Sequence, residues 1–143
     1  MEKIADNYVK LTLAAREENV AIARLAAATI AGEMAFTFNE AEEIKVAVSE
    51  GISNAMIHGY QGDKSRLVEM SLIVKGDELM IKIRDDGIGI DNIEEAMQPT
   101  FTSVADRMGL GFVFMQSFMD SLEVISKPGQ GTTLVMKKKV AGA

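Results

Sequence analysis

The chain has 143 residues, no cysteine and a formal net charge of −6. This length suits one ordinary domain that needs no disulfide or structural metal, so we expect residues 1–143 to fold as a single domain. The acidic balance excludes a general nucleic-acid binder, which should present a basic face. With no signal-peptide pattern and no apolar run long enough to span a bilayer, the sequence predicts a cytoplasmic protein without membrane contact.

Hydrophobic periodicity predicts the elements in chain order. We expect a strand near 8–13, a helix over 17–31, a second helix over 40–60, a strand hairpin over 68–75 and 79–85, a long loop over 87–107 with one helical turn near 93–97, a helix over 109–119, and two closing strands near 122–126 and 132–138. This order predicts a two-layer α/β sandwich, with a mixed, mostly antiparallel sheet and helices on one face.

The helix predicted over 40–60 carries Glu50, Asn54 and His58, each four residues after the last. Residues at this spacing share one helix face, so a carboxylate, a carboxamide and an imidazole line up beside core positions. This stripe is either a nucleotide and metal site on the helix wall or the polar margin of an ordinary amphipathic helix. The stretch alone leaves both interpretations open.

The ends of two elements are also predicted from local signals. Asn39, with Glu42 three residues later, has the pattern of a capping box that begins the second helix. Gly59 is a candidate C-terminal cap of the same helix, next to His58, which suits either a structural cap or a catalytic role. The run of three lysines over 137–139 is interpreted as a solvated strand end.

Period two places Asp85 on the core-facing side of its strand. A buried carboxylate without a donor would cost several kcal/mol, so Asp85 needs a partner. That partner is either a protein group, such as a backbone amide or an arginine, or the amine of a purine. Gly87 and Gly89 follow directly, and glycines there allow backbone to approach a flat ligand closely.

Residues 109–111 read Gly-Leu-Gly before a predicted helix, where free backbone amides favour phosphate. A simple helix-entry turn explains the same residues equally well. Arg107, two residues earlier, is either a solvated loop cation or a ligand for a terminal phosphate. The segment 129–133 is more commonly a plain hairpin turn.

The combination is more specific than its parts. The helix-wall pair Glu50 and Asn54, the motif over 85–89, the glycines over 109–111 and residues 131–133 occur in this order. Together they resemble the ATPase and kinase superfamily that includes gyrase, the Hsp90 chaperones, histidine kinases and MutL. This resemblance covers residues 39–138 and implies the Bergerat fold and Mg-ATP.

A narrower resemblance comes from residues 49–60, 94–102 and 118–120, which are similar to the anti-sigma F factors of spore-forming bacteria. That family implies a homodimeric serine protein kinase. It would hold a sporulation sigma factor inactive and phosphorylate a serine on an anti-anti-sigma protein. General-stress switch kinases of the same fold are the nearest alternative, and a non-catalytic, ATP-dependent sigma-binding module is a rival of another class. Glu50 favours the kinase interpretation, because a module that only binds a sigma factor needs no general base at this position.

The resemblance also implies roles for individual residues. Glu50 would be the general base and Asn54 a Mg²⁺ ligand, while Arg107 would approach the γ-phosphate and Arg24 would bind partner proteins. Nucleotide contacts would come from Asn54, Asp85, Gly87, Gly89, Thr102, Gly109, Leu110, Gly111 and Thr132. Asp85 and Thr132 would meet the adenine, Gly87 and Gly89 would border it, and Gly109 and Gly111 would border the phosphates. The loop after Thr102 departs from the family pattern, because it is shorter and lacks a lysine.

Overall fold

The computed structural model describes residues 5–98 and 104–141, with side chains for all of these except residues 104–108. Its elements in chain order are β1 (Asn7–Ala14), α1 (Asn19–Glu33), α2 (Phe38–Asn54), the π-helical turn η1 (Ala55–Gly59), β2 (Leu67–Lys75), β3 (Glu78–Asp85), α3 (Ile93–Ala96), α4 (Val104–Phe118), β4 (Ser121–Ser126) and β5 (Thr132–Lys139). The predicted order of strands and helices is therefore confirmed, including the short helical turn in the long loop.

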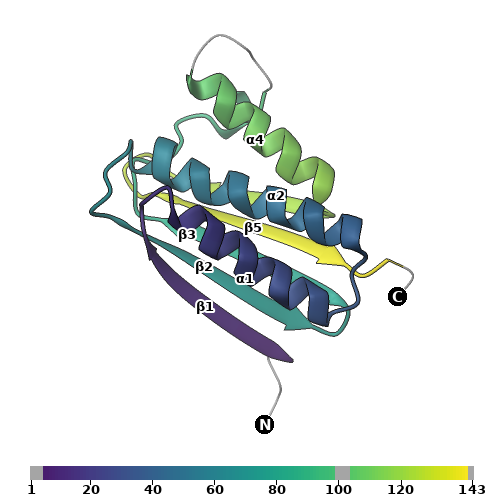
Figure 1. Ribbon diagram of the computed structural model, residues 1–143. Helices are drawn as coiled ribbons and strands as arrows, with labels where there is room; N and C mark the ends of the chain where they lie inside the picture. The colour runs from purple at the N-terminus through teal and green to yellow at the C-terminus, as the bar shows by residue number, and fades with distance from the viewer. Residues whose placement is uncertain (1–4, 99–103, 142–143) are drawn as a thin grey trace.

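The five strands form one sheet in the order β1-β2-β3-β5-β4. Helices α1, α2 and α4 lie together on one face of it, which gives the two predicted layers (Figure 1). Every pairing between described strands is antiparallel, so the prediction of a mixed sheet is wrong. The reason is that β3 and β4, which run in the same direction, are separated by β5, and β5 is antiparallel to both.

The core lies between the sheet and the helices. Strand β3 alternates buried and solvent-facing residues, as period two requires. On α1 the buried positions are alanines at four-residue spacing, and these small side chains let α1 pack closely against its neighbours. Each fully buried aliphatic side chain contributes about 1.5–3 kcal/mol through removal from water. The largest fully buried side chains include Phe112, Ile44, Ile52, Met70, Leu72, Leu79, Ile81, Ile83, Met115 and Met136.

Helix α2 begins two residues earlier than the capping pattern at Asn39 predicts. The side chain of Thr37 accepts a hydrogen bond from the Glu40 amide at 3.1 Å, and the Glu40 carboxylate accepts one from the Thr37 amide at 2.8 Å. The Asn39 prediction is wrong because two overlapping segments have the same spacing. The box at Thr37 forms, and Phe36 beside it is buried.

The C-terminal end of this helix also differs from the prediction. After Asn54 the helix widens into η1, where the Tyr60 amide bonds to the Ala55 carbonyl five residues back at 2.9 Å. Gly59 is therefore not a left-handed cap, and the positive φ angles fall on Gln61 and Gly62. A π-helical turn changes the spacing of side chains, so His58 does not continue the α-helical stripe of Glu50 and Asn54.

The lysine run at the end of β5 is not wholly solvated. Lys138 is only 8% exposed, because period two on β5 directs it toward the helices. Its amine donates to the carbonyl of Phe118 at the C-terminus of α4 and lies 4.0 Å from the Glu43 carboxylate. A buried cation thus satisfies a terminal carbonyl of α4, where the helix dipole favours positive charge.

Candidate functional site

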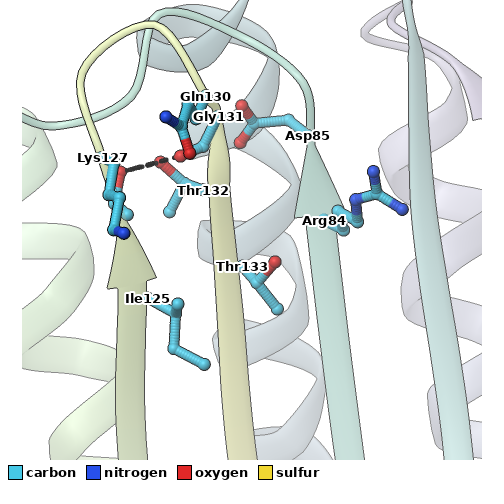
Figure 2. A pocket seen from close by; sticks show the side chains of 9 residues that line it. Arg84, Asp85, Ile125, Lys127, Gln130, Gly131, Thr132 and Thr133 are labelled. Carbon is cyan, nitrogen blue, oxygen red and sulfur yellow. Dashed lines mark hydrogen bonds between the residues drawn. The ribbon is translucent and has the colours of Figure 1, made fainter.

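Three polar side chains form the last row on the helix-covered face of the sheet. Asp85 of β3 pairs in register with Thr132 of β5, which pairs with Ser126 of β4. Asp85 is 6% exposed and Thr132 is 9% exposed. Figure 2 shows Asp85 and Thr132 at adjacent strand ends. We call Ser126, Thr132 and Asp85 the strand-end row; the preceding inward-facing row, Val124, Leu134 and Ile83, is apolar.

Asp85 has a protein donor, as its predicted burial requires. The Gly87 amide donates to its Oδ1 at 2.9 Å. Burial raises the pKa of Asp85 to about 6, and the charge of Asp86 adds to this effect, whereas the amides of Gly87 and Thr132 oppose it. A carboxylate accepts several hydrogen bonds, so Asp85 retains capacity for a further donor, and such a donor would favour its ionised form.

The glycines near Asp85 are explained first by contacts within the protein. A Cβ on Gly59 would lie 2.6 Å from Asp85 Oδ1, and one on Gly87 would lie 2.1 Å from the Gly59 carbonyl oxygen. Gly89 has φ +74° and sits against the carbonyl of Lys127. The loop after β3 is thereby pressed between η1 and the β4–β5 turn. That Gly87 and Gly89 also border a base stays a prediction.

Tyr60 fixes the peptide that follows Asp85. Its hydroxyl donates to the Leu67 carbonyl at 2.5 Å and accepts from the Asp86 amide at 2.8 Å. The guanidinium of Arg66 lies 4.8 Å from the centre of the Tyr60 ring and donates to the Asp86 carbonyl. Tyr60 is not among the predicted site residues. The signal for it is a tyrosine at the end of a buried helix face, whose hydroxyl needs a partner.

Glu50 and Asn54 of α2 meet α4 at Gly111. A Cβ on Gly111 would lie 3.0 Å from Glu50 Oε2 and 3.8 Å from Asn54 Nδ2, so a side chain there would press on both groups. We call Glu50, Asn54 and Gly111 the helix wall. Among the described residues, Asn54 Nδ2 is the buried side-chain nitrogen or oxygen that has no hydrogen-bond partner. Leaving such a group unpaired costs about 1–3 kcal/mol. A buried polar group without a partner is typical of a position where a ligand supplies the missing hydrogen bond.

The helix wall fits Mg²⁺ only in company with a ligand. The described residues contain no group of three or more histidine, cysteine, aspartate or glutamate side chains that could hold a metal. Mg²⁺ in phosphate-transfer sites commonly takes one or two protein oxygens and completes its shell with phosphates and water. Rotating the Asn54 amide by 180° would put its carbonyl oxygen where the unpaired nitrogen lies, and oxygen is the donor that Mg²⁺ prefers.

The strand-end row and the helix wall are joined by one helical run. Gly59, against Asp85, follows Asn54 by five residues, a rise of about 6–8 Å along the helix. The structure therefore brings Asp85, Thr132, Glu50, Asn54 and Gly111 into one region, although they come from β3, β5, α2 and α4.

The glycines at 109 and 111 do not open a helix, contrary to the prediction. Helix α4 begins at Val104, so the amides of residues 109–111 lie beyond the first turn, where amides pair within the helix. A Cβ on Gly109 would lie 2.1 Å from the Gln98 carbonyl oxygen, and Leu110 is half-buried. Arg107 lies within α4, but its side chain is outside the described part, and Thr102 falls in the undescribed segment 99–103. The roles of all five stay predictions.

A cavity of about 180 Å³ reaches the strand-end row from the open face of the sheet (Figure 2). Its lining includes the strand-end row itself and outward-facing residues of three strands. The lining residues are Arg84, Asp85, Ile125, Ser126, Lys127, Gln130, Gly131, Thr132 and Thr133. The cavity thus shares Asp85 with the region toward Asn54, whereas the helix wall lies on the helix-covered side of the sheet (Figure 1).

Arg24 lies on α1 next to the helix that carries Glu50. Its guanidinium donates to Ser49 Oγ at 3.5 Å, and Ser49 directly precedes Glu50. Ile22 and Leu25 on either side are exposed. The arginine thus sits half-buried among apolar surface residues, which is compatible with the predicted partner role.

Comparison with known proteins identifies a domain family and, within it, relatives that are similar over nearly the whole chain. The pattern that describes the histidine kinase-like ATPase domain matches residues 13–138. The anti-sigma F factor of Clostridium acetobutylicum is 44% identical over 95% of this chain and 96% of its own length. That of Geobacillus kaustophilus is 41% identical over 94% of both chains.

Solved structures share the fold at lower identity. The RsbU and RsbW domains of a Mycobacterium tuberculosis protein superpose with a TM-score of 0.66 at 17% identity, over 94% of this chain and 32% of that longer one. A blue-light activated histidine kinase of Erythrobacter litoralis gives a TM-score of 0.55 at 24% identity, over 74% of this chain and 32% of that one. No described helix here has both the length and the apolar character needed to cross a bilayer.

Proposed function

This chain belongs to the histidine kinase-like ATPase domains and, among them, to the anti-sigma F factors, and from that premise we propose that it is an anti-sigma factor with Mg-ATP-dependent serine kinase activity. It binds and inhibits a sporulation sigma factor in the cytoplasm. Its phosphorylation substrate is a serine on an anti-anti-sigma protein, and it works as a homodimer.

One observation carries the nucleotide part of this proposal. A buried, unpaired amide on Asn54 lies beside the Glu50 carboxylate, one short helical run from a buried carboxylate with spare accepting capacity on Asp85. An unpaired amide at one end and a carboxylate that can accept a further hydrogen bond at the other match a ligand with phosphates at one end and a hydrogen-bonding base at the other. Structural packing alone gives no reason to leave the Asn54 amide unpaired.

Separate residues bind the base, the metal ion and the phosphates of the nucleotide. Asp85 accepts a hydrogen bond from the exocyclic amine of adenine, and Thr132 beside it lines the same end of the site. Asn54 holds Mg²⁺ through its carbonyl oxygen, and the ion when bound supplies positive charge against the charge of the phosphates. Arg107, at the start of α4, adds a second positive charge near the γ-phosphate.

Glu50 serves the transfer step itself. It accepts the proton of the substrate serine hydroxyl and orients that oxygen toward the γ-phosphorus. The serine O–P bond forms while the bond from the γ-phosphorus to the β,γ-bridging oxygen breaks, so ADP leaves with that bond's electron pair. Arg24, half-buried between α1 and α2, contacts the partner proteins from the surface next to this helix.

The test uses the whole protein, labelled Mg-ATP and the anti-anti-sigma partner. We expect phosphoserine on the partner, and we expect E50Q to bind ATP normally while transfer falls about 10²–10⁴-fold, the usual contribution of a general base. E42Q is the matched control, because Glu42 is exposed on the same helix and pairs with Lys45 at its surface. A wild-type protein that binds ATP and never transfers phosphate would favour the non-catalytic sigma-binding module instead.

A further inference from the structure

Ser126, at the end of β4, joins three segments around the strand-end row. Its Oγ lies 2.9 Å from the Ile90 amide, 2.9 Å from the Gly131 carbonyl oxygen and 2.8 Å from Thr132 Oγ1. These partners belong to the loop after β3, the β4–β5 turn and the start of β5. Figure 2 shows Gly131 and Thr132 side by side and next to Asp85. Ser126 is not among the predicted site residues, because its partners are revealed only by the fold.

The three contacts determine where each hydroxyl hydrogen lies. A serine hydroxyl has one hydrogen and two accepting lone pairs. The Ile90 amide can only donate, and the Gly131 carbonyl can only accept, so Ser126 accepts from the first and donates to the second. Its hydrogen is then used, and the contact with Thr132 is made by the threonine hydrogen. Only this arrangement satisfies all three bonds at once.

Thr132 is therefore left with lone pairs alone for any other neighbour. Asp85, its register partner on β3, also accepts when ionised. Two adjacent acceptors at the end of a buried row favour a donor from the ligand, and they disfavour a ligand acceptor at the same place. Adenine presents an exocyclic amine, whereas guanine presents a carbonyl oxygen at the equivalent ring position.

We propose that Ser126 is a positioning residue for base specificity: by holding the Thr132 hydrogen, it makes the site select aminopurine over oxopurine nucleotides. This inference rests on the proposed nucleotide function and adds a residue that acts through Thr132. Loss of Ser126 frees the Thr132 hydroxyl to rotate and donate, so a guanine carbonyl gains a partner. Discrimination by one buried polar group commonly amounts to a factor of ten or more.

The experiment measures dissociation constants for Mg-ATP and Mg-GTP by calorimetry. We expect S126A to lower the ATP-over-GTP preference about tenfold, through tighter GTP binding relative to ATP. S126T, which keeps a hydroxyl, should preserve the preference. S121A is the matched control, since Ser121 is exposed on the same strand. In a T132V background, S126A should leave the preference unchanged, because the hydroxyl through which Ser126 acts is gone.

Each contrary result has a separate meaning. Equal weakening of both nucleotides in S126A, or an unchanged ratio, would overturn the inference and leave Ser126 as a structural residue. If S126A does not fold, T132V decides alone, and an unaltered ratio there also overturns the inference. A wild-type protein that binds neither nucleotide overturns the proposed function itself.

Discussion

The polar side chains of the strand-end row have hydrogen-bond partners within the protein, whereas one polar group of the helix wall has none. Asp85 accepts the Gly87 amide, and Thr132 is held by Ser126. Asn54, by contrast, buries an amide nitrogen with no partner. The row is thus organised before a ligand arrives, and the wall is completed by one. This difference predicts that adding bulk at the row displaces groups that the protein already holds, while removing the unpaired amide at the wall leaves the unliganded protein intact.

The largest expected effect comes from filling the space beside Asp85. In G59V the new side chain would start 2.6 Å from Asp85 Oδ1, so the carboxylate or the loop after β3 must move. We expect ATP affinity to fall by about 100-fold or more, because the buried Asp85 carboxylate, which the Gly87 amide holds, cannot move aside without loss of packing and hydrogen bonding. Calorimetry with Mg-ATP measures the loss.

G62A provides the control, because Gly62 lies three residues later in open space, with nothing within 4 Å of an added Cβ. Because φ at position 62 is positive, an alanine there is mildly strained. The G62A variant should therefore lose a little stability and keep its ATP affinity. Equal ATP affinity in G59V and wild type would show that the carboxylate of Asp85 is not held for a ligand.

A smaller effect is expected from pH. Burial raises the pKa of Asp85 to about 6 from 3.8, so ionisation of this carboxyl destabilises the unliganded fold above pH 6. That penalty is absent below the unfolded-state pKa of 3.8. A bound amine donor favours the ionised form, so ligand affinity should fall about tenfold between pH 7 and pH 5 as Asp85 becomes protonated.

D85N separates this titration from that of ATP itself. It should bind ATP weakly, with only the pH dependence that the phosphates contribute. Its unliganded form should be more stable than wild type at pH 7 by about 1–3 kcal/mol, since it removes a buried charge. A wild-type pH profile identical to that of D85N would mean that Asp85 does not meet the ligand.

Local patterns predict part of this site well. Period two is enough to put Asp85 inward, because alternation along β3 needs no knowledge of neighbouring strands. The four-residue spacing of Glu50 and Asn54 likewise places both on one face of α2, but the fold alone reveals that this face meets α4. The start of α2 is not decided locally, since Thr37 and Asn39 offer equivalent capping patterns. Ser126 and Tyr60 act through partners up to 36 residues away, which no local pattern identifies.

The smallest expected effect tests the helix wall, and its sign matters more than its size. In the unliganded protein the unpaired Asn54 amide costs about 1–3 kcal/mol of stability. N54A removes that cost, although the small cavity that it leaves offsets part of the stability gained. We expect an unchanged or slightly raised melting temperature, together with loss of the Mg²⁺ dependence of ATP binding. N19A is the matched control: the Asn19 amide is half-buried and donates to the Ala14 carbonyl at 2.9 Å, so its loss should cost about 1 kcal/mol. If N54A destabilises the unliganded protein as much as N19A does, Asn54 contributes to folding as an ordinary paired side chain, and the contrast between the two regions fails.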